Sequence, residues 1–582
     1  MTTALAPVEV PTTRRGGFAF SRNALALAVF AMGAIDVASA LLSHPPHRLV
    51  ELEHLLPTAV LETSRTFTLV AGVLLLLAAW GLRRGKRRAF VFALFLCALS
   101  VPVNVLKALD VEEATVAAAL LFALGVTGDA FRVKSRELSW RGWGVFALGT
   151  LAGLLLAATL GAWWVERRFG APGQASLGDA FGAAVAGLVG LGPGVALPHP
   201  TDTGAAARTA RWVAGALPAL GLGYVVGAAS LALRPARHDR RHGVQRRAIE
   251  RLALAHGTTG VAPFVGDLDV FLSPNRRAGI AYRAEADTLL ALGDPLGPPE
   301  EIPSLLFAFE TYCRERDWEF AFFQGSPPYL PFYAARRWRA IGVGVEPVID
   351  PADWTLEGAA MGDVRRAVKR LEEAGVTVRS FRPPGEAFGF EPGLLAGMRA
   401  VSQAWLSAHP GGEKTFGMGR FEPRELPQRW LLCAVSAQGR VEGFLTWAEV
   451  PALRGWSLDL MRRRADAPAG VMDLLLATSA GLARAHEDRA LSLGLSALVS
   501  TDESPDAERV RAFLRKRLGG VYDFEGLYHW KKKFRPRLEE RFLVVPGTLA
   551  LPRVLYALAK AQSPGGLART LGGLFPNRKE KT

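Results

Sequence analysis

The apolar residues of this 582-residue chain are concentrated in long runs that end near Leu233. A helix needs about 20 mostly apolar residues to cross a bilayer. Six segments approach that length: Ala24–Leu42, Leu61–Leu82, Ala89–Leu106, Glu113–Val126, Trp143–Val165 and Trp212–Leu233. The sequence therefore predicts a tail at residues 1–23 and an α-helical membrane domain of about six spans at residues 24–233. The Gly/Ala-rich stretch Leu177–Leu191 suits a re-entrant or interfacial segment.

Basic residues in the short loops predict the orientation of these spans. They follow the second, fourth and sixth spans: Arg83, Arg84, Lys86, Arg87 and Arg88; Arg132, Lys134, Arg136 and Arg141; Arg234, Arg237, Arg240, Arg241, Arg246 and Arg247. The longer loop at residues 166–211 is an exception, and long loops count for less in this rule. We expect a multi-pass protein of the cell membrane with both termini, and everything after Leu233, in the cytoplasm.

Residues 234–251 form a basic juxtamembrane linker in a chain whose formal net charge is +15. Anionic lipids attract such segments by about 1 kcal/mol per Lys or Arg near the surface. The linker is therefore expected to lie against headgroups and to lead into the first cytoplasmic helix.

After the linker, candidate strands and helices alternate to about residue 546. Two successive mixed α/β units are the simplest account of this pattern, at residues 252–378 and 379–547, with a basic C-terminal helix and tail at residues 548–582. Strands are expected at, among others, Val261–Pro263, Ala286–Ala291, Trp456–Met461 and Ala490–Leu495.

Several classes of function lack their motifs in this sequence. The three cysteines (Cys97, Cys313, Cys433) have no metal-binding spacing and suggest no disulfide framework, which is typical of a reducing cytoplasm. The phosphate-binding loop, the nucleophile elbow and the zinc-protease motif do not occur either. Nothing predicts a metal site, a cofactor, a nucleotide-fuelled pump or a metal hydrolase.

The segment from Trp456 to Asp473 has a high density of charged residues. A strand is expected to place Asp459 near its end, with Arg462, Arg463 and Arg464 in the loop that follows. Pro468–Gly470 then opens a helix with Asp473 in its first turn, where backbone N–H donors collect. Asp459 and Arg462 could pair with each other or divide between a substrate amine and a phosphate. Alternatively, Asp473 only caps the helix dipole and the arginines are solvated.

Two further segments could contact a ligand. Small residues around Phe416 and Phe421, after a helix containing Trp405, suit a close approach of the backbone to a ligand, or form an ordinary glycine loop. The second segment interleaves aromatic residues with cations, a pattern that suits nucleic acid or merely a solvated helix face: Tyr522, Phe524, Tyr528, Trp530, Lys531, Lys532, Lys533, Arg535 and Arg537.

Five strings in this half resemble one known family in the same order along the chain. They are ALGDPLG (Ala291–Gly297), FGMGRF (Phe416–Phe421), SLDLMRRRADAPAGVMDLL (Ser457–Leu475), LSLGLSAL (Leu491–Leu498) and FEGLYHWKKKFRPRLEERFLVVPG (Phe524–Gly547). They look like the phosphatidylglycerol lysyltransferase (aminoacyl-phosphatidylglycerol synthase) family, of the multiple peptide resistance factor type, which is linked to cationic-peptide resistance. The resemblance covers residues 245–547, and the chain resembles a short form without the extra N-terminal spans of the longest members.

This resemblance implies two tandem GNAT-like acyltransferase folds, with the active centre in the second and no cofactor. Aminoacyl-tRNA would donate the aminoacyl group, and the headgroup hydroxyl of phosphatidylglycerol would accept it. The motifs assign catalysis to Asp459, Arg462, Asp473 and Lys533, and substrate binding to Arg420, Phe416, Trp405, Arg463, Lys531 and Lys532. Lysyl transfer is the first expectation, although the helix after Asp473 departs from the family's acidic pattern at residues 477–480. A homo-oligomer is also possible.

Three other interpretations stay open. The spans could flip a lipid, with Asp36 and the Glu62/Arg65 pair as the sequence support. The second half could use acyl-CoA, although the loop Arg464–Gly470 lacks the first glycine of that branch's pyrophosphate motif. The GNAT-like pair could also be an inactive module that senses tRNA or lipid.

Overall fold

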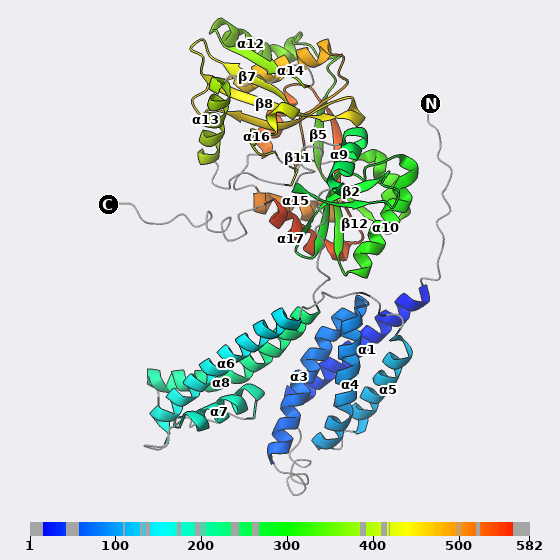
Figure 1. The fold of residues 1–582 in the computed structure, drawn as a ribbon, viewed down its shortest axis with the longest axis vertical. Helices are drawn as coiled ribbons and strands as arrows, with labels where there is room; N and C mark the ends of the chain where they lie inside the picture. The colour runs from blue at the N-terminus through cyan, green and yellow to red at the C-terminus, as the bar shows by residue number, and fades with distance from the viewer. Residues whose placement is uncertain are drawn as a thin grey trace. The chain divides into compact units, whose positions relative to one another are not determined.

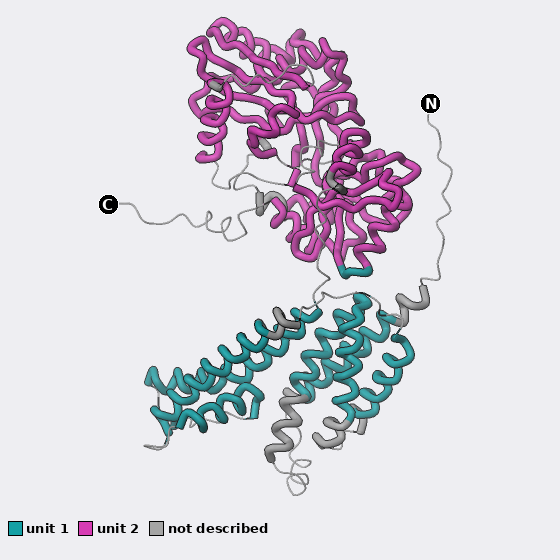
Figure 2. Tube along the Cα trace, in the orientation of Figure 1, with its two compact units in different colours: residues 1–237, 315–317 teal, residues 238–314, 318–582 magenta. Residues whose placement is uncertain are grey.

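The computed structural model describes most of the chain. The described residues are 16–41, 58–108, 111–128, 131, 133, 140–170, 176–191, 198, 199, 202, 204–233, 244–258, 267–383, 392–408, 416, 417, 419–497, 499, 502–518 and 524–562. The chain divides into two compact units, residues 1–237 with 315–317, and residues 238–314 with 318–582 (Figure 2).

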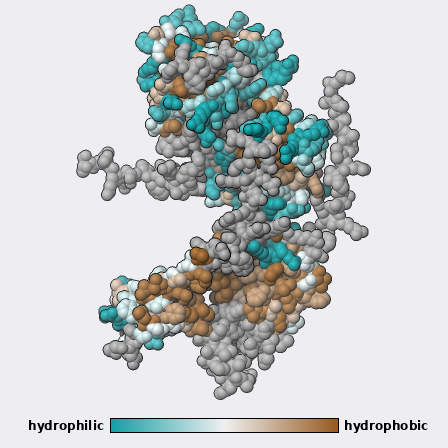
Figure 3. All heavy atoms as spheres, in the orientation of Figure 1, coloured by the Kyte–Doolittle hydropathy of each residue, from teal (hydrophilic) through white to brown (hydrophobic). Residues whose placement is uncertain are grey.

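The described part of the first unit is built mainly from helices (Figure 1). They are α1 (Gly16–Leu41), α3 (Thr58–Arg83), α4 (Arg87–Ala108), α5 (Val111–Val126), α6 (Trp140–Phe169), α7 (Leu177–Val189) and α8 (Ala205–Ala232). Many large apolar side chains face outward, among them Phe122, Val145 and Trp212, each more than 70% exposed. Figure 3 shows apolar residues over much of the visible surface of this unit. Such a surface is the one that a bilayer solvates.

Small residues let α1 and α3 pack closely. A Cβ on Gly33 would lie 2.8 Å from the carbonyl oxygen of Gly72, and a Cβ on Gly72 would lie 2.8 Å from the Cβ of Asp36. Asp36 is 2% exposed in this contact. Close backbone approach through small residues is a common way for helices to associate in membranes.

All six segments expected to span a membrane are helical. Three helical stretches are long and apolar enough to cross a bilayer: Arg22–Ser39, Ala147–Phe169 and Ala205–Ala232. A membrane domain is therefore supported, whereas the count of six spans remains a prediction. The Gly/Ala-rich stretch forms the 13-residue helix α7, which Ser176 caps and the left-handed Gly190 ends. The side chains of Glu62 and Arg65, and residues 234–243 of the linker, lie outside the described residues.

The second unit alternates helices and strands. Its helices are α9 (Val244–His256), α10 (Ile302–Glu315), α11 (Leu330–Ala335), α12 (Gly362–Glu373), α13 (Pro392–Ala408), α14 (Val471–Ala485), α15 (Pro505–Leu518), α16 (Phe524–Lys532) and α17 (Leu551–Ala561). Its strands are β1 (Asp269–Leu272), β2 (Gly279–Glu285), β3 (Thr288–Leu292), β4 (Glu319–Gly325), β5 (Arg339–Ile349), β6 (Thr377–Phe381), β7 (Trp430–Val435), β8 (Val441–Val450), β9 (Gly455–Arg463), β10 (Leu491–Ser492), β11 (Ser496–Ala497) and β12 (Arg537–Val545).

One continuous sheet runs through this unit in the order β1-β2-β3-β4-β12-β5-β10-β9-β8-β7-β6, and β11 pairs with β5. The last strand, β12, lies between β4 and β5 and is antiparallel to both. A strand from the half expected at residues 379–547 thus lies between two strands of the half expected at residues 252–378. The expected limit between residues 378 and 379 falls inside β6.

Helices cover both faces of the sheet in each half. In the first half, alternate β3 residues face opposite sides: Leu290 and Leu292 pack with α9 and α17, and Leu289 and Ala291 pack with α10. In the second half, Trp447 on β8 packs with α12 and α14, whereas Phe444 packs with α13. This alternation with a period of two is the expected pattern for a sheet that is buried on both faces.

Three local expectations change. Ala286 and Asp287 form a left-handed turn (φ 47° and 61°), so β3 begins at Thr288. The strand expected at Ala490–Leu495 is divided into β10 and β11 around Gly494, whose φ is 71°. β9 extends to Arg463, so Arg462 and Arg463 belong to a strand and not to a loop. Val261–Pro263 lies outside the described residues.

Candidate active site

The sheet of the second unit opens between β9 and β10. These parallel strands pair at only two positions, Leu491 with Trp456 and Ser492 with Ser457. Beyond Ser457, β9 continues to Arg463 along β8, while β11 pairs with β5. Parallel strands that stop pairing leave backbone N–H and C=O groups available for other partners. This strand opening is the geometric centre of the candidate site.

Asp459 lies on β9 beside the strand opening, at a β-bulge. In the ladder with β8, Leu458 opposes Trp447 and Leu460 opposes Thr446, so Asp459 opposes no residue. A bulge bends a strand and redirects a side chain, and bulges are frequent next to active sites. The hydroxyl of Thr446 stabilises this bulge because it accepts a hydrogen bond from the Leu460 N–H at 3.0 Å.

The hydrogen bonds that described residues donate to Asp459 both go to one carboxylate oxygen, Oδ2. Thr446 Oγ1 donates to Asp459 Oδ2 at 3.1 Å, and Arg429 Nε donates to the same oxygen at 3.2 Å. Arg429 also donates to Glu425 Oε2 at 3.3 Å through Nη2. The side chains of Asp459 and Arg429 are 7% and 8% exposed. One guanidinium is therefore shared between two carboxylates at a mostly buried position.

The second oxygen, Asp459 Oδ1, has no hydrogen-bond partner among the described residues. It lies against Gly419, where a Cβ would come within 2.1 Å of it. Burial raises the pKa of the Asp459 carboxyl, and the positive charge of Arg429 opposes that shift. Burial also raises the pKa of Glu425, again against Arg429. A buried, half-satisfied carboxylate is a good candidate for binding a cationic or hydroxyl donor.

Arg462, for which a pair with Asp459 was one of two alternatives, has other neighbours. Its side chain is buried, donates through Nη1 to Ser402 Oγ, and lies over the ring of Trp405 at 4.8 Å from the centroid. Both of these residues are on α13. The expected Asp459–Arg462 pair is therefore replaced by Asp459–Arg429, and Arg462 only adds a weaker electrostatic effect on the Asp459 pKa.

Asp473 and the basic segment form a second group. Asp473 is in the first turn of α14, and Trp530 Nε1 on α16 donates to its Oδ1 at 2.7 Å. Because α14 and α13 cover opposite faces of the sheet, Asp473 lies on the face opposite to Arg462. The four residues expected to be catalytic thus fall into two groups. Lys532 and Lys533, at the end of α16, are exposed.

Lys531 is buried, unlike its two neighbours. It is 3% exposed, and its Nζ donates to the carbonyls of Gly494 and Leu495 and to Ser496 Oγ at 3.0, 3.5 and 3.3 Å. Burial lowers its pKa to about 8. The ammonium of Lys531 is thus held inside the fold by three acceptors, while the assignment of Lys531 to substrate binding stays a prediction.

The other expected substrate-binding residues differ in exposure. Phe416 is 2% exposed and stacks on Phe323 within the core of the first half, with ring centroids 6.1 Å apart, and its assignment to substrate binding stays a prediction. Arg420 is exposed and pairs with Asp267 at 3.4 Å. Arg463 is exposed at the end of β9. Among the described residues, no cluster of His, Cys, Asp and Glu could hold a metal ion.

Arg429, Thr446 and Glu425 were not predicted. Arg429 precedes a strand and Thr446 lies inside one, and neither belongs to a motif that carries chemistry. Their role depends on the bulge, which moves Asp459 out of the regular alternation of β9. The sequence has no local signal for that register shift.

Residues 249–545 match the family model described as "Phosphatidylglycerol lysyltransferase, C-terminal". The chain belongs to this family. All the residues placed around the strand opening lie within the matched segment. The family is the one that the five sequence strings resemble, so that expectation is confirmed.

Several relatives are similar over different lengths. The "Phosphatidylglycerol lysyltransferase" of Staphylococcus haemolyticus is 27% identical over 284 residues, which are 48% of this chain and 33% of that protein. The "Lysylphosphatidylglycerol biosynthesis bifunctional protein LysX" of Rhodococcus opacus is 27% identical over 526 residues, 86% of this chain and 44% of that protein. The chain thus matches about a third of the staphylococcal relative's length.

The fold also resembles a solved structure, "The structure of L-PGS from Bacillus licheniformis". The TM-score is 0.50 and the identity 23%, over 56% of this chain and 99% of that chain. This likeness supports the fold of the second unit.

Proposed function

We propose that this chain transfers a lysyl group from lysyl-tRNA to the headgroup hydroxyl of phosphatidylglycerol at the inner leaflet of the cell membrane. The observation that carries the proposal is the family match over residues 249–545, which contains the buried Asp459 and the strand opening. The names of the relatives supply the lipid and the amino acid.

The proposed reaction exchanges one ester for another. The lipid hydroxyl oxygen attacks the carbonyl carbon of the lysyl ester, and a new C–O bond forms to the lipid. The bond from that carbon to the ribose oxygen of the tRNA breaks, and the hydroxyl proton ends on the ribose oxygen. The two esters have similar energy, so the protein mainly has to orient the reactants and stabilise the developing oxyanion.

Asp459 is proposed to hold the ammonium of the lysyl group through Oδ1. This oxygen has no described hydrogen-bond partner, and Arg429 and Thr446 fix the carboxylate through Oδ2. A charge-assisted hydrogen bond from an ammonium would satisfy the buried oxygen. The exposed Lys532 and Lys533 are proposed to contact phosphate groups of the donor, because salt-sensitive cation–phosphate contacts dominate nucleic-acid affinity.

An apolar helical unit suits a lipid acceptor. The match with the Rhodococcus opacus protein extends over 86% of this chain, beyond the part that matches the family model. The exposed apolar side chains of this unit fit a bilayer environment. We propose that this unit keeps the enzyme at the membrane that supplies phosphatidylglycerol, with the second unit in the cytoplasm, where aminoacyl-tRNA is found.

Transfer from acyl-CoA is a weaker alternative. A CoA pyrophosphate would need the backbone N–H groups before α14. Here the Ala469 carbonyl accepts a hydrogen bond from Arg370 Nη2 at 2.8 Å, and a Cβ on Gly470 would lie 2.8 Å from the Cβ of Ala367. This loop is thus packed on α12, and Asp473 adds a negative charge in the first turn of α14.

Lipid transport by the helical unit is a second candidate, favoured by the burial of Asp36 between α1 and α3. An ionisable group at membrane depth is costly and often functional. Asp36→Asn separates the two activities. Loss of outer-leaflet lysyl lipid with unchanged total lysyl lipid would establish transport, whereas unchanged exposure of the lipid would exclude Asp36 from it.

The test of the proposed function is lipid extraction after expression of the full chain in a bacterium that makes phosphatidylglycerol but no aminoacylated lipid. Mass spectrometry should show phosphatidylglycerol with the added mass of a lysyl group. In membranes, formation of this lipid should stop after RNase treatment and should not require acyl-CoA. A different amino acid would correct the donor, and RNase-resistant transfer from acyl-CoA would overturn the proposal in favour of the alternative.

Asp459→Asn supplies the site control for this experiment, with Asp466→Asn as the matched variant. Asp466 lies on the loop after β9, and its exposed carboxylate pairs with Arg440 and Arg464. Loss of lysyl lipid in the first variant but not in the second is expected. Equal activity of the two variants would remove Asp459 from the site.

A further inference from the structure

The helix α16, which ends at the exposed Lys532 and is followed directly by the exposed Lys533, is too short to fix its own orientation. It has nine residues, and isolated helices of fewer than about 12 residues are marginal in water. Its position therefore depends on tertiary contacts. Trp530 donates to Asp473, and Phe534, which is fully buried, packs against the Trp530 ring at 5.2 Å. Lys531 provides the remaining polar anchor on the inner side.

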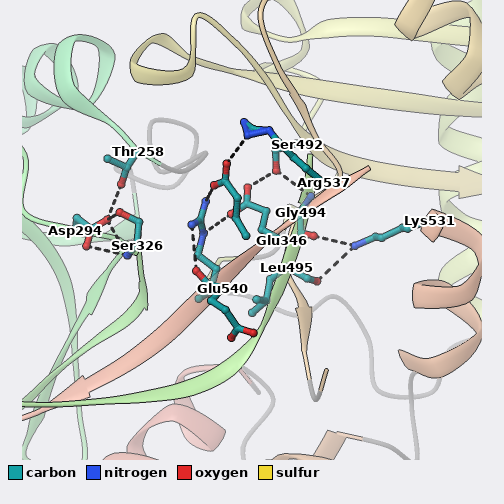
Figure 4. A network of polar contacts seen from close by, with 12 residues as sticks. Thr258, Asp294, Ser326, Glu346, Ser492, Gly494, Leu495, Lys531, Arg537 and Glu540 are labelled. Carbon is teal, nitrogen blue, oxygen red and sulfur yellow. Dashed lines mark hydrogen bonds and ion pairs between the residues drawn. The ribbon is translucent and has the colours of Figure 1, made fainter. Parts of the chain in front are cut away.

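Lys531 donates hydrogen bonds to the backbone just after the end of β10. Gly494 and Leu495 lie between β10 and β11, beyond the last pair of β10 with β9, and their carbonyls accept from Lys531 Nζ (Figure 4). Ser496 on β11 adds its hydroxyl oxygen. Three acceptors on one side of the strand opening are thus satisfied by a single ammonium from α16.

A buried ion pair holds the same segment from the other side. Glu346 on β5 accepts from Ser492 Oγ through Oε1 and from Arg541 Nε on β12 through Oε2, the latter at 2.5 Å. Ser492 Oγ also accepts from the Gly494 N–H at 3.1 Å. Figure 4 shows this chain of contacts from Glu346 through Ser492 and Gly494 to Lys531. The anchor point of α16 is therefore rigidly connected to the centre of the sheet.

From this arrangement we infer that Lys531 is a positioning residue, which sets the orientation of α16 so that Lys532 and Lys533 face the phosphate groups of the donor tRNA. Successive residues of a helix project about 100° apart, so an inward Lys531 directs its neighbour outward. The inference rests on the proposed function, and it gives Lys531 a role without substrate contact. Loss of its ammonium would leave the donor-binding cations in place but no longer correctly oriented.

The test uses the full chain in vesicles of phosphatidylglycerol and phosphatidylcholine, with labelled lysyl-tRNA as the varied substrate. Lys531→Met should raise the KM for lysyl-tRNA about tenfold and leave kcat within about twofold, because binding changes and the chemical step does not. The slope of log KM against log salt should fall by about 1 to 2, as for the loss of one or both phosphate contacts. Lys560→Met, an exposed lysine of α17 paired with Glu285, is the control and should match wild type.

A double-mutant cycle separates positioning from general destabilisation. If Lys531 acts through Lys532 and Lys533, the variant Lys531→Met/Lys532→Met/Lys533→Met should be no worse than Lys532→Met/Lys533→Met. Additive effects, an unchanged salt slope, or a fall of kcat at unchanged KM would overturn the inference. If Lys531→Met does not fold, Ser496→Ala removes one acceptor of the same anchor and should raise KM in the same direction; unchanged KM in that variant would equally overturn it.

Failure of the proposed function is distinguishable from failure of this inference. If wild-type protein forms no lysyl lipid, the function itself is wrong. If wild-type protein is active and the Lys531 and Ser496 variants keep its KM and salt slope, only the positioning role is wrong.

Discussion

Two buried carboxylates flank the strand opening, and they differ in how their oxygens are satisfied. Glu346 has a partner on each carboxylate oxygen, Ser492 on one and Arg541 on the other. The side chain of Glu346 is 3% exposed and that of Arg541 is 1% exposed. Asp459 has both partners, Arg429 and Thr446, on a single oxygen. A saturated pair holds the strands of the two halves together. A half-satisfied carboxylate keeps a strong acceptor ready for a ligand.

Breaking the saturated pair should have the largest effect. Arg541→Met leaves Glu346 buried without its countercharge, and removal of one partner from a buried pair costs about 3–5 kcal/mol. We expect a large fall in the thermal unfolding midpoint of the detergent-solubilised chain, and loss of activity with the fold. Arg541→Met/Glu346→Gln removes both charges and should recover part of the lost stability. A single variant as stable as wild type would show that this pair does not hold β5 and β12 together.

Asp459→Asn should have the opposite profile, with a large effect on activity and a small one on stability. Removal of one preorganised electrostatic contact typically lowers kcat by about 10²–10³-fold. Because burial raises the pKa of this carboxyl, a neutral amide costs less to bury, and the free energy of unfolding should stay within about 1 kcal/mol of the wild-type value. Lysyl-lipid formation and thermal unfolding, measured on the same preparation, check both. A variant that loses stability and activity together would give Asp459 the same structural role as Glu346.

A smaller effect is expected at Gly419, which tests the close approach of the backbone to Asp459. A Cβ at this position would lie 2.1 Å from Oδ1, so the carboxylate or the backbone must shift. Gly419→Ala should lower activity about tenfold, with a stability cost of about 1–3 kcal/mol for overpacking. Gly393→Ala on α13 is the matched control, because nothing lies within 4 Å of its added Cβ. Equal behaviour of the two variants would mean that the space around Oδ1 does not matter.

The elements of the second unit were predictable because hydrophobic periodicity and turn residues mark them locally. The helix opening after Gly470 lies where the pattern of residues 456–473 predicts it, and the strand before it is also present, although it extends to Arg463. The helices of the first unit follow from the same reasoning on long apolar runs. The position of β12 between β4 and β5 could not be predicted from the sequence, because strands that pair across almost 200 residues leave no local pattern.

The candidate site was predicted only in part, because the sequence shows local charge patterns but not the contacts that the fold makes. Asp459 and Asp473 were found because unusual charges interrupt apolar segments. Arg429 and Thr446 were missed because the bulge at Asp459, and not residue spacing, brings them to the carboxylate. Lys531 was grouped with Lys532 and Lys533 as a surface charge, since a run of lysines does not reveal which one points inward. Burial and three acceptors in the fold distinguish it.

The pH dependence of stability should distinguish Lys531 from its exposed neighbours, and it is the smallest effect that we expect. Burial lowers the pKa of Lys531 from 10.5 to about 8, while the negative charge of Glu346 opposes that shift and Arg541 pairs with Glu346. Between pH 8 and 10.5 the unfolded chain then binds more protons at this position than the folded chain, so this lysine makes the free energy of unfolding rise with pH. The difference in the free energy of unfolding between wild type and Lys531→Met should show that rise. A flat difference would mean that Lys531 titrates as a solvated lysine does, and the contrast between the buried Lys531 and the surface lysines would then be lost.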